Sequence, residues 1–363
     1  MRISVMIAVY KEAELLGDII KKLLECNFQD KEILVAVDGD VMPDIETALK
    51  PYQERITIFY NQARLGKVDS LNRLCSHATG NAFLFLDNDI ELPEDTYFLD
   101  KLNDQLIEFD IVEMPKEAIT KNWFSRIVGY DFLGAAITSL LTAKLFHKNL
   151  FLNGAAFAIR RNVFEELGGF PKVVNEDWEL MLKAFGKGNR YAFPTELKVK
   201  NSVPTTITEW IEQRKRWALG ACYWQKQIFD DIKRLFKGLP IILNILVLML
   251  IPVIACSILW KFAFLDQIIL LFSILLKQYL GVNLGALYFV SYLSVFLHGG
   301  FSVIIALSIS SMVFFIFSRI LRFHFNILEY ILYYLIYFPV LVSFYIFFGI
   351  SVTVSQPNFD WKV

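Results

Sequence analysis

The last third of the chain consists of long stretches with almost no charge, and this feature most limits the possible folds. Up to about Gly238 charged and apolar residues are mixed as in a globular domain, whereas from Leu239 onward charged residues become rare. About 20 apolar residues suffice to cross a bilayer as a helix. The whole sequence is 55% hydrophobic and 20% charged, too apolar for an ordinary soluble enzyme. We therefore expect a soluble domain over residues 1–237 and a transmembrane helical region over residues 238–363.

We expect about four membrane spans beyond Pro240, give or take one. Their expected ranges are Ile241 to Trp260, Gln267 to Leu280, Leu284 to Ile309, and Ile327 to Val354. The apolar run continues from Ile309 to Phe317, which leaves room for a fifth span or an interfacial helix.

Basic residues gather just before the first expected span. They are Arg214, Lys215, Arg216, Lys226, Lys233, Arg234 and Lys237. The positive-inside rule then places the soluble domain in the cytosol of a multi-pass protein of the cell membrane. A solvated helix face explains some of these lysines equally well. The net charge of -1 and the absence of a basic stripe argue against a nucleic-acid partner. The four scattered cysteines indicate neither a disulfide framework nor a zinc site.

Short β-rich runs alternate with amphipathic segments at the start of the chain. Strands are expected at residues 3–9, 33–37, 56–60 and 82–86, and helices at residues 12–24 and 67–77. The first run is too short for a signal peptide. This alternation predicts an α/β fold with a parallel, doubly wound sheet. Ligands of such sheets bind beyond the carboxyl ends of the strands, where Tyr10, Asp38 and Asp87 all fall.

Three further elements are expected in the soluble domain. A long helix over residues 122–146 contains Arg126, Asp131 and Lys144, so it packs on the domain or lies along the membrane surface rather than crossing it. Residues 151–159 predict a buried strand that opens at Gly154, where a small residue permits close approach of a ligand or strand. Another helix begins at about Ile207.

The tripeptide Asp87-Asn88-Asp89 follows an apolar strand. At the end of a strand both carboxylates can converge on one hard cation that keeps positions open for phosphate oxygens. The alternative is that these residues only form a turn. Asp38 also ends a strand, where its carboxylate can accept hydrogen bonds from a nucleobase or ribose. Lys67, at the start of a helix, can balance the charge of a diphosphate.

Two later motifs complete the set. Asn175-Glu176-Asp177 precedes a short helix, and Asp177 is the candidate base for an acceptor hydroxyl, although a plain helix cap needs no function. The segment from Gln213 to Trp217 offers an amide, guanidinium groups and an indole, which can hold a pyrophosphate and stack on a sugar. A tryptophan at a membrane interface is by itself common.

The order of these motifs resembles that of the membrane-bound family-2 glycosyltransferases with a GT-A (Rossmann-like) nucleotide-sugar-binding domain. The resemblance covers about the first two thirds of the chain, and Gln213 to Trp217 matches the Q-x-x-R-W pattern of cellulose, chitin and hyaluronan synthases and of ceramide glucosyltransferases. The other matching segments are Ala8 to Glu12, Asp38, Gly66 to Asn72, Asp87 to Asp89, Gly154 to Ala156, and Glu176 with Asp177.

The resemblance implies a role for each matching residue. A UDP- or GDP-sugar donor would be bound by Ala8, Tyr10, Glu12, Asp38, Lys67, Asp87 and Asn88. Asp87 and Asp89 would hold Mg²⁺ or Mn²⁺, and Asp177 would deprotonate the acceptor while the anomeric centre inverts. The acceptor and diphosphate would contact Gly154, Glu176, Gln213, Arg216 and Trp217. Lys11 and Asn175 depart from the family's usual Asn and Thr, which weakens the assignment of nucleoside preference and acceptor contacts.

The sequence therefore predicts an inverting, metal-dependent glycosyltransferase that acts on a membrane lipid at the cytosolic face. A processive synthase that elongates a glycan and secretes it is the alternative within the class, although about four spans leave less material for a channel. A non-catalytic nucleotide-binding scaffold or transporter is the alternative from another class. The complete set of acids and the charge-poor spans argue against it.

Overall fold

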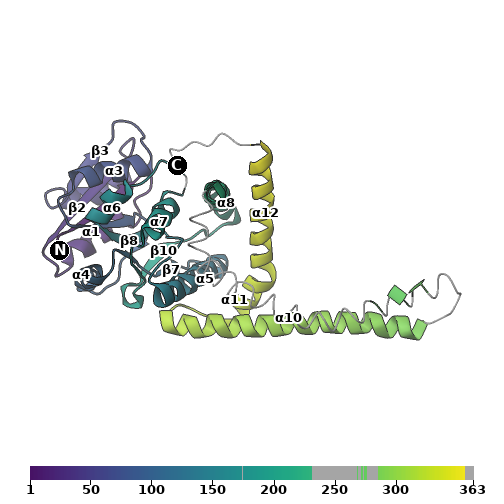
Figure 1. Ribbon diagram of the computed structural model, residues 1–363. Helices are drawn as coiled ribbons and strands as arrows, with labels where there is room; N and C mark the ends of the chain where they lie inside the picture. The colour runs from purple at the N-terminus through teal and green to yellow at the C-terminus, as the bar shows by residue number, and fades with distance from the viewer. Residues whose placement is uncertain (174, 231–267, 269–270, 273, 276–284, 356–363) are drawn as a thin grey trace. The chain divides into compact units, whose positions relative to one another are not determined.

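The structure, a computed structural model, describes residues 1–173, 175–230, 268, 271–272, 274–275 and 285–355 (Figure 1). By its contacts the chain divides into two compact units. One comprises Met1–Ile241 together with Ile336–Val363, and the other comprises Ile242–Leu335. The predicted boundary after residue 237 stays a prediction; the contacts add that the C-terminal segment groups with the first unit.

A seven-stranded sheet forms the centre of the first unit, with the order β3-β2-β1-β4-β8-β6-β9. The strands are β1 (Ile3–Val9), β2 (Lys31–Val37), β3 (Thr57–Tyr60), β4 (Ala82–Asp87), β6 (Ile111–Glu113), β8 (Ala156–Arg160) and β9 (Tyr191–Ala192). The first four are parallel, as predicted. The expectation of a wholly parallel sheet is wrong, because β8 runs antiparallel to both β4 and β6.

Helices cover this sheet (Figure 1). They include α1 (Leu16–Glu25), α2 (Pro43–Leu49), α3 (Lys67–His77), α4 (Phe98–Glu108), α6 (Arg161–Leu167) and α7 (Glu176–Lys187). The strand at Ile3–Val9 and the helix at Lys67–His77 have the predicted bounds. Helix α1 begins four residues later than predicted at Glu12, and Lys11, just before that position, has a positive φ of 63°. Buried apolar residues of α1 pack on β1, where Leu16 and Ile20 join Val5 and Ile7 in the core.

A smaller sheet lies beside the carboxyl end of β4. It has the order β5-β10-β7, with β5 at Ile90–Glu91, β10 at Val199–Ser202 and β7 at Lys116–Ile119. Helix α5 (Trp123–Phe146) packs against β7, so the predicted long helix packs on the domain. Asn122 and Ser125 form a capping box at its start, which satisfies backbone N–H groups that a helix leaves free. The predicted strand over residues 151–159 is shorter, because β8 begins only at Ala156.

Helix α8 (Ile207–Asp230) begins where predicted and packs against α12 (Phe338–Ser355) within the first unit. The Trp210 indole donates a hydrogen bond of 2.7 Å to the Tyr337 hydroxyl. Its ring also lies 5.5 Å from that of Phe344. The C-terminal apolar helix is thus joined to the rest of the first unit through side chains of α8.

Two described segments are long and apolar enough to cross a membrane, namely Val303–Leu321 and Ile327–Phe348. The first belongs to α10 (Gly285–Leu321), which joins the expected span at residues 284–309 and the apolar continuation to residue 317 in one helix. The second includes α11 (Ile327–Leu332), the π-helical turn Tyr333–Tyr337 and most of α12. The expected span at 241–260 lies outside the described residues, as does most of the one at 267–280.

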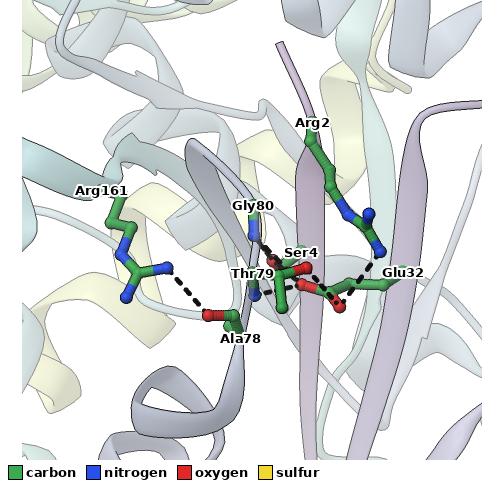
Figure 2. Close-up of polar contacts among 7 residues, drawn as sticks. All are labelled: Arg2, Ser4, Glu32, Ala78, Thr79, Gly80 and Arg161. Carbon is green, nitrogen blue, oxygen red and sulfur yellow. Dashed lines mark hydrogen bonds and ion pairs between the residues drawn. The ribbon is translucent and has the colours of Figure 1, made fainter.

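The amino end of the central sheet is held by the carboxylate of Glu32 (Figure 2). It accepts hydrogen bonds from the Ser4 hydroxyl, from the Thr79 N–H at 2.6 Å and from the Gly80 N–H at 3.1 Å. Burial works to raise the pKa of Glu32, but these hydrogen bonds and the charge of Arg2 outweigh it and hold the pKa below its usual value. Glu32 therefore ties β1 and β2 to the turn before β4, at the edge away from the predicted site.

Glu32→Ala should destabilise the protein by about 2 kcal/mol, because it leaves the N–H groups of Thr79 and Gly80 without their acceptor. Thermal unfolding of the detergent-solubilised full chain, followed by tryptophan fluorescence, measures the loss. Glu94→Ala is the matched control, since the Glu94 side chain is 87% exposed. Equal melting temperatures for the two variants would contradict this role of Glu32.

Candidate active site

The carboxyl ends of three adjacent strands bring the first predicted residues together. β1 lies between β2 and β4, and its register places Ala8 opposite both Ala36 and Asp87. Tyr10 and Asp38 follow directly after β1 and β2. The side chain of Asn88 donates a hydrogen bond to the Glu12 carbonyl oxygen, which joins the loop after β1 to the turn after β4. The predicted edge of the sheet therefore collects the residues that the sequence indicated.

Asp38 is almost completely buried and shapes the loop that leads into α3. Its carboxylate accepts hydrogen bonds from the Leu65 N–H at 2.7 Å, the Gly66 N–H at 2.8 Å and the Asn61 amide at 3.0 Å. Gly66 has a φ of 93°, which favours glycine at this turn. The prediction that Asp38 contacts a nucleoside remains a prediction; the structure assigns it three contacts that set the position of Lys67.

Arg64 is a residue that the sequence did not single out. Its guanidinium carbon lies 4.3 Å from the centre of the Tyr10 ring, in the geometry of a cation–π contact. The buried Arg64 Nε has no hydrogen-bond partner among the residues that the structure describes. The planar cation of Arg64 thus lies over the ring of Tyr10, at the end of β1 where a nucleoside is expected.

Lys67 links two acidic segments that are far apart in the sequence. Its Nζ lies 2.6 Å from Asp87 Oδ1 and 4.0 Å from Glu176 Oε1. Burial works against the charged ammonium, but the carboxylates of Asp87 and Glu176 outweigh it and raise the pKa of Lys67. Lys67 is therefore a permanent cation that spans the gap between the turn after β4 and the start of α7.

Asp89 has the chemistry of a ligand to a hard cation. Its buried Oδ1 has no hydrogen-bond partner in the described part of the chain, while Oδ2 accepts a hydrogen bond of 3.2 Å from the Asn201 amide. Burial, together with the nearby charge of Asp87, raises the pKa of Asp89 to about 7. A free buried oxygen in an acidic setting fits Mg²⁺ or Mn²⁺. Among the described residues, no group of three or more His, Cys, Asp or Glu side chains is arranged to hold a metal ion.

Asp177 sits at the first turn of α7 with both carboxylate oxygens held by backbone groups. Oδ2 accepts a hydrogen bond of 2.7 Å from the Gly154 N–H, and Oδ1 accepts one of 2.8 Å from the Trp178 N–H. Burial raises the pKa of Asp177. Burial and the charge of Asp177 likewise raise the pKa of the neighbouring Glu176 to about 7. The fixed orientation and raised pKa suit a general base.

Gly154 leaves room for the carboxylate of Asp177. A Cβ added at Gly154 would lie 2.8 Å from Asp177 Oδ2 and 3.2 Å from its Cγ. The short Asp side chain is fixed at both oxygens, so it cannot turn away without losing a hydrogen bond. The predicted small residue at the start of this segment therefore has a specific structural reason.

Gly154→Ala should lower the rate of the reaction about a hundredfold, because displacing a catalytic group by 1 Å has a cost of this order. The measurement is kcat at saturating substrate concentrations, with the unfolding temperature recorded in parallel. Gly186→Ala is the control, since nothing lies within 4 Å of a Cβ at that position. An unchanged kcat in Gly154→Ala would show that the reaction does not depend on the exact position of the Asp177 carboxylate.

The residues predicted on α8 are only partly joined to this site. Gln213 Oε1 is buried without a hydrogen-bond partner among the described residues, whereas Arg216 and Trp217 are exposed. In the part of the chain that the structure describes, no hydrogen bond or ion pair joins these three side chains to the carboxylates. The helix meets the site at Gly220, where an added Cβ would lie 2.0 Å from Asn175 Oδ1. That contact, between a helix and the residue before Glu176, was not predicted.

Part of the chain is similar in sequence to known glycosyltransferases. Residues 4–168 match the model of the family Glycosyl transferase family 2. The chain has 25% identity over 240 residues with probable glycosyltransferase YdaM of Bacillus subtilis, covering 61% of this chain and 56% of that protein. It has 33% identity over 81 residues with probable glucomannan 4-beta-mannosyltransferase 6 of Oryza sativa, covering 22% of this chain and 14% of that protein. The alignments thus span about half of the first relative and a seventh of the second.

One solved structure shows the same fold. It is the mannosyltransferase PcManGT from Pyrobaculum calidifontis in complex with GDP-Man and Mn2+. The TM-score is 0.50 with 22% sequence identity, over 62% of this chain and 64% of that chain.

Proposed function

We propose that this chain, which contains a family-2 glycosyl transferase domain, moves a sugar from a nucleotide-sugar to a membrane lipid at the cytosolic face. The observation that carries the proposal is the joined set Asp87, Lys67 and Glu176 beside the oriented carboxylate of Asp177. A fixed cation flanked by acids suits a diphosphate with its counter-ion, and an adjacent base suits an acceptor hydroxyl.

The donor would lie over the carboxyl ends of β2, β1 and β4. Tyr10 and Arg64 present an aromatic ring and a planar cation to a nucleobase. Asp38 holds the loop that positions Lys67, whose ammonium then neutralises part of the diphosphate charge. Asp87 and Asp89 would hold a divalent cation, which supplies further neutralisation of charge on the leaving diphosphate when bound.

The chemical step assigned to this chain is an inverting displacement. Asp177 accepts the proton of the acceptor hydroxyl as its oxygen forms a bond to the anomeric carbon of the sugar. The bond from that carbon to the diphosphate oxygen breaks with its electron pair, and the nucleoside diphosphate leaves. The hydrogen bonds from the N–H groups of Gly154 and Trp178 keep the Asp177 carboxylate in one orientation throughout.

The apolar helices support the proposal that the acceptor is a membrane lipid. Val303–Leu321 and Ile327–Phe348 are long and apolar enough to cross a membrane, and α8 carries side chains that contact α12. A multi-pass chain with its catalytic domain in the cytosol would therefore keep α8 near lipid headgroups. Glu176, Gln213, Arg216 and Trp217 are the proposed contacts of the acceptor and diphosphate.

A polymer product is the second candidate. The relatives named glucomannan 4-beta-mannosyltransferases favour it, and together with the GDP-Man in the PcManGT complex they make GDP-mannose the first donor to test. The alternative of a non-catalytic scaffold predicts that the acids can be replaced without consequence.

Transfer of label separates these functions. Membranes that contain the full chain are offered radiolabelled GDP-mannose and UDP-sugars with Mg²⁺ or Mn²⁺, and products are divided into organic-soluble and polymeric fractions. Label in a small organic-soluble product supports the lipid acceptor, and label in a large polymer supports the synthase. Donor that binds but is never turned over with lipid or glycan extracts supports the scaffold.

A further inference from the structure

A buried polar cluster joins α5, α8 and the end of the π-helical turn Tyr333–Tyr337, just before α12, within the first unit. Arg214 Nη2 lies 2.7 Å from Asp131 Oδ2, and its side chain is 2% exposed. The Tyr337 hydroxyl donates a hydrogen bond of 2.5 Å to the same Asp131 oxygen. It also accepts the hydrogen bond of 2.7 Å from the Trp210 indole N–H. We call these four residues the α8 anchor.

The anchor holds one face of α8 in a defined position. Trp210, Arg214 and Trp217 are spaced by four and three residues, so they follow one another along the same side of the helix. The Arg214 guanidinium carbon also lies 4.2 Å from the centre of the Trp217 ring. A buried ion pair fixes geometry strongly, because removing one partner leaves the other charge buried without compensation.

A later turn of the same helix contacts the residue that precedes the acidic pair Glu176-Asp177. Gly220 packs so closely on Asn175 that any side chain would overlap the Asn175 amide, with an added Cβ 2.5 Å from its Cγ. Asn175 is the N-cap residue of α7, whose first two residues are Glu176 and Asp177. Six residues separate Gly220 from Arg214, or about 9 Å along a helix axis. A short segment of α8 therefore connects the anchor to the start of α7, where Glu176 and Asp177 lie.

We infer that the α8 anchor is a positioning device through which α12 sets the placement of Asp177 for transfer. Arg214 and Tyr337 are its positioning residues, through their contacts with Asp131, Trp210 and Trp217. When α12 is in place, the hydroxyl of Tyr337, just before α12, is hydrogen-bonded to both Asp131 and Trp210. The position of α8 is then fixed, and so is the contact of Gly220 with Asn175. The inference rests on the proposed function, since it assigns a regulatory role in the same reaction to the apolar C-terminal helix.

The location of the α8 anchor distinguishes a positioning role from a general effect on the stability of the domain, because none of its residues belongs to the donor side. The donor side is held by contacts of its own, because Asp38 accepts hydrogen bonds from the N–H groups of Leu65 and Gly66, and Lys67 pairs with Asp87. Loosening α8 should therefore leave donor binding intact and displace only the acceptor side and the base. A displacement of about 1 Å at a catalytic group is enough to lower a rate up to a hundredfold.

Tyr337→Phe is the primary test, because it keeps the ring and removes only the hydroxyl that Asp131 and Trp210 share. The full chain in lipid nanodiscs is expected to lose about tenfold in kcat per donor-binding site, with the dissociation constant of the donor changed less than twofold. Arg214→Lys, which keeps the charge but not the planar fork, is expected to act in the same direction. Tyr97→Phe is the matched control, since the Tyr97 ring is 58% exposed on another part of the domain.

Hydrogen exchange provides a second readout that does not depend on turnover. Tyr337→Phe should speed amide exchange in residues 176–180 and 207–220, and leave exchange in β1, β2 and α3 as in the wild type. A lower unfolding temperature together with unchanged exchange at residues 176–180 and unchanged kcat per site would overturn the inference. If the wild-type protein transfers no sugar at all, the proposed function fails, and the exchange comparison still decides whether α12 positions the loop.

Discussion

Replacing Asp177 by asparagine should lower kcat for sugar transfer by about 10²- to 10⁴-fold, the usual contribution of a general base. Asparagine has nearly the same shape but cannot accept the proton of the acceptor hydroxyl. Donor affinity should change little, because Lys67 and Asp87 keep their own ion pair of 2.6 Å. The measurements are single-turnover transfer at saturating acceptor concentration and equilibrium binding of the nucleotide-sugar.

The pH profile of the wild type adds a second check. Burial raises the pKa of Asp177, and the base acts only when it is deprotonated. Activity should therefore fall on the acid side at a pH above the normal range of an aspartate. Asp95→Asn is the matched control, because Asp95 lies outside the site and pairs with Lys101. An Asp177→Asn variant with more than a third of the wild-type kcat would remove Asp177 from the mechanism.

Asp89→Asn should abolish turnover and leave the fold intact. The change removes one charge from a site where Asp89 Oδ1 is buried without a hydrogen-bond partner among the described residues. A divalent cation stabilises charge on a departing diphosphate directly, so a site that cannot hold it loses this stabilisation. Chelation of the metal should reduce wild-type transfer to the same background level.

Metal binding can be followed without catalysis. Mn²⁺ at a concentration a hundred times its dissociation constant should raise the free energy of unfolding of the wild type by about 2.7 kcal/mol. This stabilisation is measured as a higher unfolding temperature. The Asp89→Asn variant should show no such rise. Without metal it should be at least as stable as the wild type, because a like-charge contact with Asp87 is relieved. A normally active Asp89→Asn variant, or one that Mn²⁺ stabilises normally, would contradict the assignment.

Local patterns in the sequence predicted the first half of the fold well. The run Ile3–Val9 and the helix Lys67–His77 are found with their expected bounds, because each combines a clear periodicity with a clear end. The direction of β8 could not be predicted, since a strand of five residues with four buried in a row has no pattern that distinguishes parallel from antiparallel pairing. The three short strands of the second sheet are too brief for a periodic signal.

The position of the acidic residues was predictable because strand ends share one edge of a sheet. Tyr10, Asp38 and Asp87 fall together there, and Lys67 reaches Asp87 from the next helix. The Asn201 contact to Asp89 was not predictable, because 112 residues separate the two and nothing in the local sequence marks Asn201. The family pattern drew attention to Arg216, yet the structure buries Arg214 on the face toward α5 and α12. Which arginine is buried depends on partners that are distant in the sequence.

Transfer of label by the purified full chain tests the central claim most directly. The wild type and Asp177→Asn, each in lipid nanodiscs with Mn²⁺ and a membrane lipid extract, are offered nucleotide-sugars labelled in the sugar. The wild type should move label into an acceptor and release one nucleoside diphosphate for each sugar transferred, while Asp177→Asn binds the donor but transfers sugar at least about a hundredfold more slowly. Donor binding without transfer by the wild type, or equal transfer by both proteins, would contradict the account.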